Sequence, residues 1–169
     1  MISEMVLPEF EHEMASTRKV LERIPEDKLG WKPHEKSMTM GRLAGHVAEL
    51  ANWGVHTLKL DQLDLSPRAD GTYESHSMST REDTLQKFDG WVAEAKEALR
   101  STPDDAFNKT WTLTAKGQTF LSMPRGAVLR NVVLNHMIHH RGQLSVYLRL
   151  NGVPVPGMYG PSADEGSGF

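Results

Sequence analysis

Two histidines spaced four residues apart, His136 and His140, are the residues of this sequence best placed to do chemistry. They fall within a helical pattern, and residues four apart in an α-helix project from one face, so both imidazoles can reach one point. The same face of a helical wheel carries residues typical of a buried core, namely Leu129, Val132, Val133, Leu144, Tyr147 and Leu150. Val and Leu side chains supply no partners for the ring nitrogens of two buried imidazoles. A shared metal ion would satisfy one nitrogen on each, although the spacing alone is also compatible with two structural histidines that other groups satisfy.

A third ligand has to come from another helix, because three protein ligands leave the open coordination position that reactive metal sites keep. His46 is the best candidate, since it lies on the same side of its predicted helix as Leu43, Leu50 and Trp53. Four other histidines lie among polar neighbours or in predicted connections: His12, His34, His56 and His76. Glu49 follows His46 one turn later, where a carboxylate could fix an imidazole, act as a general base, or simply be solvated.

His139 lies three residues from His136 and competes with His140 for the role of ligand. On the helical wheel His139 lies about 80° from the centre of the apolar stripe, whereas His140 lies about 20° from it. A ligand must reach the interior of the bundle, so we interpret His140 as the ligand. His139 is interpreted as a residue behind the ligands or at an interface.

The composition indicates one domain over residues 1–169, with enough apolar residues for a single core. The 19 basic and 22 acidic residues are mixed along the chain, which leaves no positive block for nucleic acid or an anionic membrane surface. No apolar run approaches the roughly 20 residues that span a bilayer, and the acidic N-terminal residues do not resemble a secretory signal, so we expect a cytoplasmic protein. The chain contains no cysteine, so nitrogen and oxygen atoms must hold any metal.

Apolar residues recur at helical spacing in four stretches of the chain. They predict an all-α fold, a four-helix bundle with helices over residues 7–24, 40–60, 80–101 and 124–150. Thr39, directly before the second stretch, has the side chain of an N-cap. Ser79 with Glu82 three residues later forms the capping-box pattern before the third stretch.

The connections between these helices differ in character. Residues 108–123 show period-two alternation around Lys116-Gly117, which predicts a short hairpin or extended excursion between helices three and four. Residues 61–78 are polar and predict an irregular connection. The residues after Leu150 are rich in glycine and proline, so we expect them to drape over the bundle.

Several strings of this sequence occur in the same order in one known family. Residues 136–144 read His-Met-Ile-His-His-Arg-Gly-Gln-Leu, and residues 156–165 read Pro-Gly-Met-Tyr-Gly-Pro-Ser-Ala-Asp-Glu. Upstream, residues 29–33 read Leu-Gly-Trp-Lys-Pro, residues 37–43 read Ser-Met-Thr-Met-Gly-Arg-Leu, and residues 45–50 read Gly-His-Val-Ala-Glu-Leu. With these strings the chain resembles the DinB/YfiT-like family of damage-inducible metalloenzymes, which is distinct from the translesion polymerase of the same name. The resemblance covers nearly the whole chain.

The resemblance implies a four-helix bundle in which three histidines hold a metal ion. Carried onto this chain, the ligands are His46, His136 and His140. Gln143 belongs to the same string and faces the apolar stripe, so we expect it to bond a ligand or a water near the metal. Arg141 points away from the stripe, and we expect it at an interface.

The expected partners are a small-molecule substrate and a second copy of the chain. The homodimer is implied by the resemblance. It also agrees with the presence of three tryptophans that we do not expect one small core to absorb: Trp53, Trp91 and Trp111.

Three neutral imidazoles would leave a divalent ion its full charge and an open position, which makes it a Lewis acid. Nitrogen ligands suit several transition metals, with zinc and nickel favoured. Such an ion can activate water or present a low-molecular-weight thiol as a nucleophile, and the resemblance brings in relatives of both kinds. Our first hypothesis is a metal-dependent transferase that adds such a thiol to a small electrophile, with Glu49 and Gln143 as catalytic candidates. The alternatives are a metal-dependent hydrolase and a non-catalytic metal-binding stress-response bundle.

Overall fold

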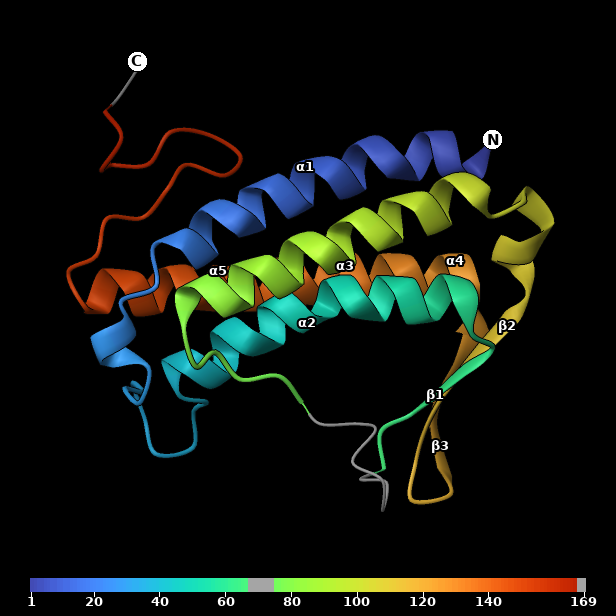
Figure 1. The fold of residues 1–169 in the computed structure, drawn as a ribbon, viewed down its shortest axis with the longest axis horizontal. Helices are drawn as coiled ribbons and strands as arrows, with labels where there is room; N and C mark the ends of the chain where they lie inside the picture. The colour runs from blue at the N-terminus through green and yellow to red at the C-terminus, as the bar shows by residue number, and fades with distance from the viewer. Residues whose placement is uncertain (67–74, 167–169) are drawn as a thin grey trace.

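The computed structural model describes residues 1–66 and 75–166, which fold into a helical bundle with a small sheet at one end (Figure 1). Residues 67–74 of the predicted connection 61–78 and residues 167–169 of the tail lie outside this part. α3 packs against both α1 and α2, and α2 also packs against α5. The four long helices are α1 (Ile2–Glu22), α2 (Met40–Lys59), α3 (Arg81–Ser101) and α5 (Asn135–Leu150).

The last helical segment is interrupted by a π-helical turn. It begins with α4 (Arg125–Val128), continues through the π turn η3 (Leu129–Leu134) and ends with α5. The segment has the predicted extent, but the π turn was not predicted. Because its backbone hydrogen bonds span five residues instead of four, the turn accommodates an extra residue and rotates α5 relative to α4.

Threonine side chains cap two of the helices. Thr39 accepts a hydrogen bond from the backbone N–H of Arg42 at 3.2 Å, which confirms the predicted start of α2. Thr80 accepts from the backbone N–H of Asp83 at 3.2 Å, so the cap of α3 lies one residue after the predicted Ser79.

α1 begins before the predicted residue 7. The N–H of Ile2 donates to Asp104 Oδ1 at 2.8 Å, and the amino group of Met1 donates to the Glu4 carboxylate at 2.7 Å. These contacts satisfy donors at the start of the helix, and Pro8 is tolerated within it. Two short 3-10 turns, η1 (Glu26–Lys28) and η2 (Asp104–Asn108), follow α1 and α3.

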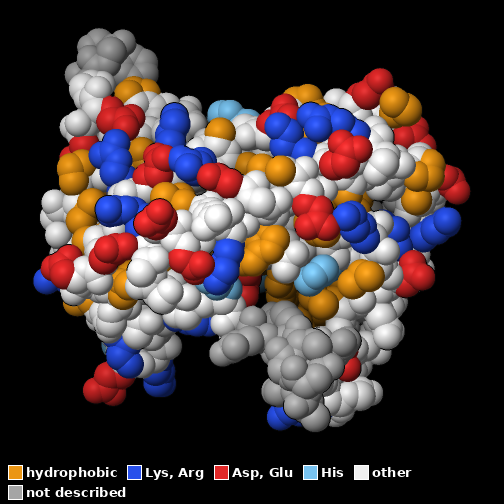
Figure 2. Space-filling view, viewed as in Figure 1, with side chains coloured by type: hydrophobic (Ala, Val, Ile, Leu, Met, Phe, Trp, Pro, Cys, Tyr) orange, Lys and Arg blue, Asp and Glu red, His pale blue; other side chains and the backbone are white. Residues whose placement is uncertain are grey.

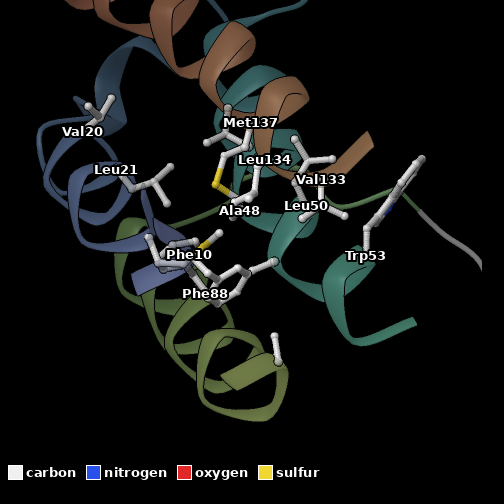
Figure 3. Close-up of a cluster of buried hydrophobic side chains, with 14 of the residues drawn as sticks. Phe10, Val20, Leu21, Ala48, Leu50, Trp53, Phe88, Val133, Leu134 and Met137 are labelled. Atoms are coloured by element: carbon white, nitrogen blue, oxygen red, sulfur yellow. The ribbon is translucent and has the colours of Figure 1, made fainter. Parts of the chain in front are cut away.

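The core lies between the long helices, where most of the labelled apolar side chains point toward one another and Trp53 lies at the edge (Figure 3). Burying each large side chain of this kind contributes about 1.5–3 kcal/mol, which is the main stabilisation of a bundle. The residues labelled in Figure 3 are Phe10, Val20, Leu21, Ala48, Leu50, Trp53, Phe88, Val133, Leu134 and Met137.

A three-stranded sheet corrects the all-α expectation, although the fold is mainly helical. β2 (Thr110–Ala115) and β3 (Gln118–Pro124) form the predicted antiparallel hairpin. Their turn places Lys116 and Gly117 at φ 50° and 73°, which suits a two-residue hairpin loop. β1 (Gln62–Asp64) pairs in parallel with β2 and was not predicted, because three residues are too short to show alternation.

The tryptophans do not support the argument for a dimer that was based on them. Trp111 on β2 is fully buried, and Trp53 is 8% exposed. Trp91 is partly buried against the core. A single chain therefore buries these tryptophans fully or in part. The homodimer stays a prediction that rests on family resemblance.

The C-terminal tail returns along the end of α1, as expected of a draped segment (Figure 1). Asp164 accepts two hydrogen bonds from the Arg149 guanidinium, at 2.9 and 2.6 Å, and one from the Val155 N–H at 2.8 Å. The Arg149 contact is the main cause that lowers the pKa of Asp164 to about 2. The tail is thus tied to the end of α5 by charge-assisted hydrogen bonds.

Acidic and basic side chains are interspersed on the face of the molecule drawn in Figure 2. This distribution agrees with the mixed charges along the sequence. No helix in the described ranges has the length and apolar character needed to cross a membrane.

Candidate metal centre

Three imidazoles meet where α2 faces α5. His46 is buried on α2, whereas His136 and His140 are half-buried on α5. The Nε2 atom of His136 lies 3.4 Å from that of His46 and 2.9 Å from that of His140. One ligand atom from each of the three histidines lies within 4.8 Å of the others, so the structure brings together the three residues that the sequence singled out.

The outer nitrogen of each ring faces an acceptor. His46 Nδ1 lies 2.6 Å from Glu49 Oε1, His140 Nδ1 lies 2.7 Å from Gln143 Oε1, and His136 Nδ1 lies 3.3 Å from the backbone oxygen of Val132. A carboxylate, an amide oxygen and a carbonyl only accept, so the Nδ1 atoms carry the ring protons. Neutral rings then direct three unprotonated Nε2 atoms at one another, and a divalent cation fits this donor set.

The local environment favours the neutral form of the two histidines on α5. Burial, together with repulsion from charge on His46 and His140, lowers the pKa of His136 to about 4. Burial is also the main cause that lowers the pKa of His140. Neutral imidazole is the form that binds a metal ion.

The lowered pKa of His136 predicts how the chelator-treated protein responds to acid. A histidine in an unfolded chain has a pKa of about 6.5. Between that pH and about 4 the unfolded chain binds a proton that folded His136 does not, so folding stability falls as the pH decreases through this window. Thermal unfolding of wild-type and His136→Gln protein at a series of pH values measures this. We expect folding stability to decrease less with falling pH in the variant than in the wild type. Parallel curves of stability against pH for the two proteins would contradict the lowered pKa of His136.

Glu49 connects His46 to the segment that precedes α3. It is 5% exposed, its Oε1 accepts from His46, and its Oε2 accepts from the backbone N–H of His76 at 2.7 Å. The guanidinium of Arg42 donates to the His76 carbonyl at 3.0 Å and lies 3.5 Å from Glu49 Oε1. Gly45 permits this approach, because a Cβ there would lie 2.5 Å from the His76 oxygen.

Removing the Glu49 carboxylate is expected to weaken metal binding. In Glu49→Ala the His46 ring loses the acceptor that orients it, and outer contacts of this kind are worth about 10–100-fold in metal affinity. Glu49→Gln is the matched control, since its amide oxygen can still accept from His46 and a smaller loss follows. Competition with a chromophoric chelator measures the affinity, and circular dichroism checks the fold. Wild-type affinity in Glu49→Ala would show that the contact does not support the site.

The wheel drawn from the sequence was wrong by one position on α5. The side chains buried most deeply there are Met137, Arg141, Leu144 and Leu148. His136 and His140 lie on the flank of this line and Gln143 is exposed, not facing the core. The π turn explains the error, because residues on its two sides do not share one helical wheel. The histidines therefore lie at the edge of the core, where a molecule can approach them.

Arg141 corrects a second expectation. It was predicted to point off the core toward an interface, but it is 1% exposed and lies inside the bundle. Its guanidinium lies 2.7 Å from the carboxylate of Glu13, which is 4% exposed. His139 is exposed, as its wheel position indicated, and its ring centroid lies 4.9 Å from that of His140.

A cavity of about 450 Å³ opens beside His140. Gln143 lines it together with residues from the loop before α2, including Lys36. Sequence reasoning did not assign this loop to the site. Its contacts with α5 join residues distant along the chain, and no periodic pattern in the loop indicates them. The Leu-Gly-Trp-Lys-Pro string just before it was the nearest signal.

Comparisons with known proteins identify the family of this chain and other structures with its fold. The sequence model of the DinB family matches residues 3–167 of this chain. The protein YrdA of Bacillus subtilis (strain 168) is 28% identical over 163 residues, which are 96% of this chain and 91% of YrdA. A crystal structure of a DinB-like protein from Bacillus cereus ATCC 10987 has a TM-score of 0.67 at 25% identity, covering 90% of this chain and 95% of that one. The structure of YjoA from Bacillus subtilis, at 20% identity and a TM-score of 0.64, shares the fold over 89% of this chain and 95% of YjoA.

Proposed function

Because this chain belongs to the DinB family, we propose that it is a metalloenzyme in which His46, His136 and His140 hold one divalent transition-metal ion. The observation that carries the proposal is the convergence of three imidazoles, each of which has its Nδ1 atom facing a hydrogen-bond acceptor. The all-nitrogen donor set suits zinc or nickel.

The activity that we propose is the transfer of a low-molecular-weight thiol to a small electrophile. When bound, the ion supplies Lewis acidity, which lowers the pKa of a thiol or a water that reaches its open position. The chain contains no cysteine that would compete with an external thiol. The cavity beside His140 provides space for a small molecule.

Glu49 and Gln143 fit the role of positioning residues better than that of catalytic ones. Glu49 accepts with both oxygens, from His46 and from the His76 backbone, on the side of the His46 ring away from the Nε2 cluster. Gln143 holds the His140 ring from its exposed side. Because both of its oxygens are engaged, Glu49 is not a free general base for either thiol transfer or hydrolysis.

One assay separates the three candidate functions. Zinc-loaded or nickel-loaded protein is incubated with a panel of low-molecular-weight thiols and a chlorodinitrobenzene, and separately with a nitrophenyl ester in the absence of thiol. Thioether formation above the rate given by His140→Ala protein supports the transferase. Ester cleavage alone would make the protein a hydrolase, and neither product would favour a non-catalytic metal-binding bundle.

A further inference from the structure

The cavity beside His140 has the size of a small-molecule site, since its volume of about 450 Å³ falls in the range of about 300–1,000 Å³ typical of ligand pockets. Its walls come from the loop before α2, from α2 and from α5. The residues are Pro33, Lys36, Ser37, Met38, Leu43, His140, Gln143, Val146 and Tyr147. A molecule that fills this cavity therefore contacts the His140 side of the proposed metal centre.

Most of this lining is apolar. Met38 is 38% exposed and Val146 is 55% exposed, so both present surface that an apolar ligand would cover. Tyr147 contributes its ring, because its hydroxyl already donates to the Met38 carbonyl at 3.2 Å. Covering such surface favours a ligand with a hydrocarbon body.

The cavity lining contains one cationic side chain, Lys36, and no carboxylate. Among the described residues Lys36 forms no ion pair, whereas the neighbouring Lys32 donates from Nζ to the Glu35 carbonyl at 2.8 Å. Lys36 is exposed, so its ammonium can pair with an anion that enters the cavity. The lining thus combines an apolar wall with a single positive charge.

We propose that this cavity selects small apolar molecules that carry a carboxylate, which Lys36 binds while the apolar body covers Met38 and Val146. The proposal rests on the proposed function and deepens it by naming the class of the electrophilic substrate. It assigns to Lys36 the role of a specificity-determining residue. The carboxylate anchors one end of the substrate, so that the rest of the molecule can lie along the wall shared with His140.

Phenylbutyrate and its neutral amide are a matched pair of probes, and isothermal titration calorimetry on the full chain measures their binding. We expect wild-type protein to prefer the acid, and Lys36→Met to lower affinity for the acid by about fivefold while the amide is unaffected. Lys32→Met on the same loop is the control, because Lys32 does not line the cavity, and it should bind the acid as the wild type does. Equal binding of acid and amide by the wild type, or no binding of either, would overturn the proposal.

A carboxylate can also bind a metal ion directly, so the titration is repeated with His140→Ala protein in chelator. If Lys36 binds the anion, the preference for the acid persists in this protein. If the preference disappears there and survives Lys36→Met, the metal binds the anion and the proposal is wrong. Failure of the proposed function would show differently, as a lack of thioether product with the binding preference intact.

Discussion

Replacing His140 with alanine is expected to abolish stoichiometric metal binding, whereas replacing His139 with alanine is expected to weaken it only modestly. His140 Nε2 lies 2.9 Å from His136 Nε2 and points into the cluster. Two remaining imidazoles on separate helices form a much weaker site than three. His139 is exposed and touches the centre only through an edge contact with the His140 ring.

The two variants are best compared side by side, because they differ by one position on the same helix. Metal content after dialysis gives the stoichiometry, and chelator competition gives the affinity. Circular dichroism establishes that both are folded. An empty site in His139→Ala with a filled site in His140→Ala would reverse the assignment of ligands on α5.

Replacing Arg141 with methionine should cost about 3–5 kcal/mol of folding stability, the range for breaking a buried ion pair by removing one partner. The guanidinium donates to the Glu13 carbonyl at 3.0 Å, to Thr17 Oγ1 at 3.1 Å and to the Tyr159 hydroxyl at 2.7 Å, and it pairs with the Glu13 carboxylate. Methionine preserves much of the volume but leaves the Glu13 charge buried without its partner. Tyr159 also donates to this carboxylate at 2.9 Å, which joins the C-terminal tail to the network.

Urea unfolding followed by circular dichroism, in chelator, measures this cost. The double variant Arg141→Met/Glu13→Gln should recover part of the loss, because no buried charge then remains unpaired. Tyr159→Phe is the milder control, with an expected loss of about 1 kcal/mol for one hydrogen bond. A loss below about 1 kcal/mol for Arg141→Met would contradict a buried ion pair and would place the guanidinium off the core, where the helical wheel predicted it.

The helices, the cap of α2 and the hairpin could be predicted because each is determined by residues close in sequence. The apolar stripes of α1, α2 and α3 and the Thr39 cap are local patterns of this kind. β1 could not be predicted, since its three residues become a strand only by pairing with β2, far along the chain. The sheet thus depends on tertiary context that no local pattern carries.

The spacing and apolar neighbours of the three histidines made them candidate ligands, and the family resemblance then implied the triad. The contacts of their Nδ1 atoms could be predicted only in part. Glu49 lies one turn from His46, so a contact with that ring was one of the alternatives that the sequence left open. Its hydrogen bond to the His76 backbone depends on how the segment before α3 docks. The position of Arg141 was missed because a single wheel was drawn through the π turn.

The metal content of the wild-type protein tests the central claim most directly. Inductively coupled plasma mass spectrometry is applied to protein purified without chelator, and again after reloading with zinc or nickel and removal of excess metal. Three histidine ligand atoms that lie within 4.8 Å of one another predict near one equivalent of a divalent transition metal per chain. A chain that retains no metal even after reloading would contradict the assignment of His46, His136 and His140 as a metal centre.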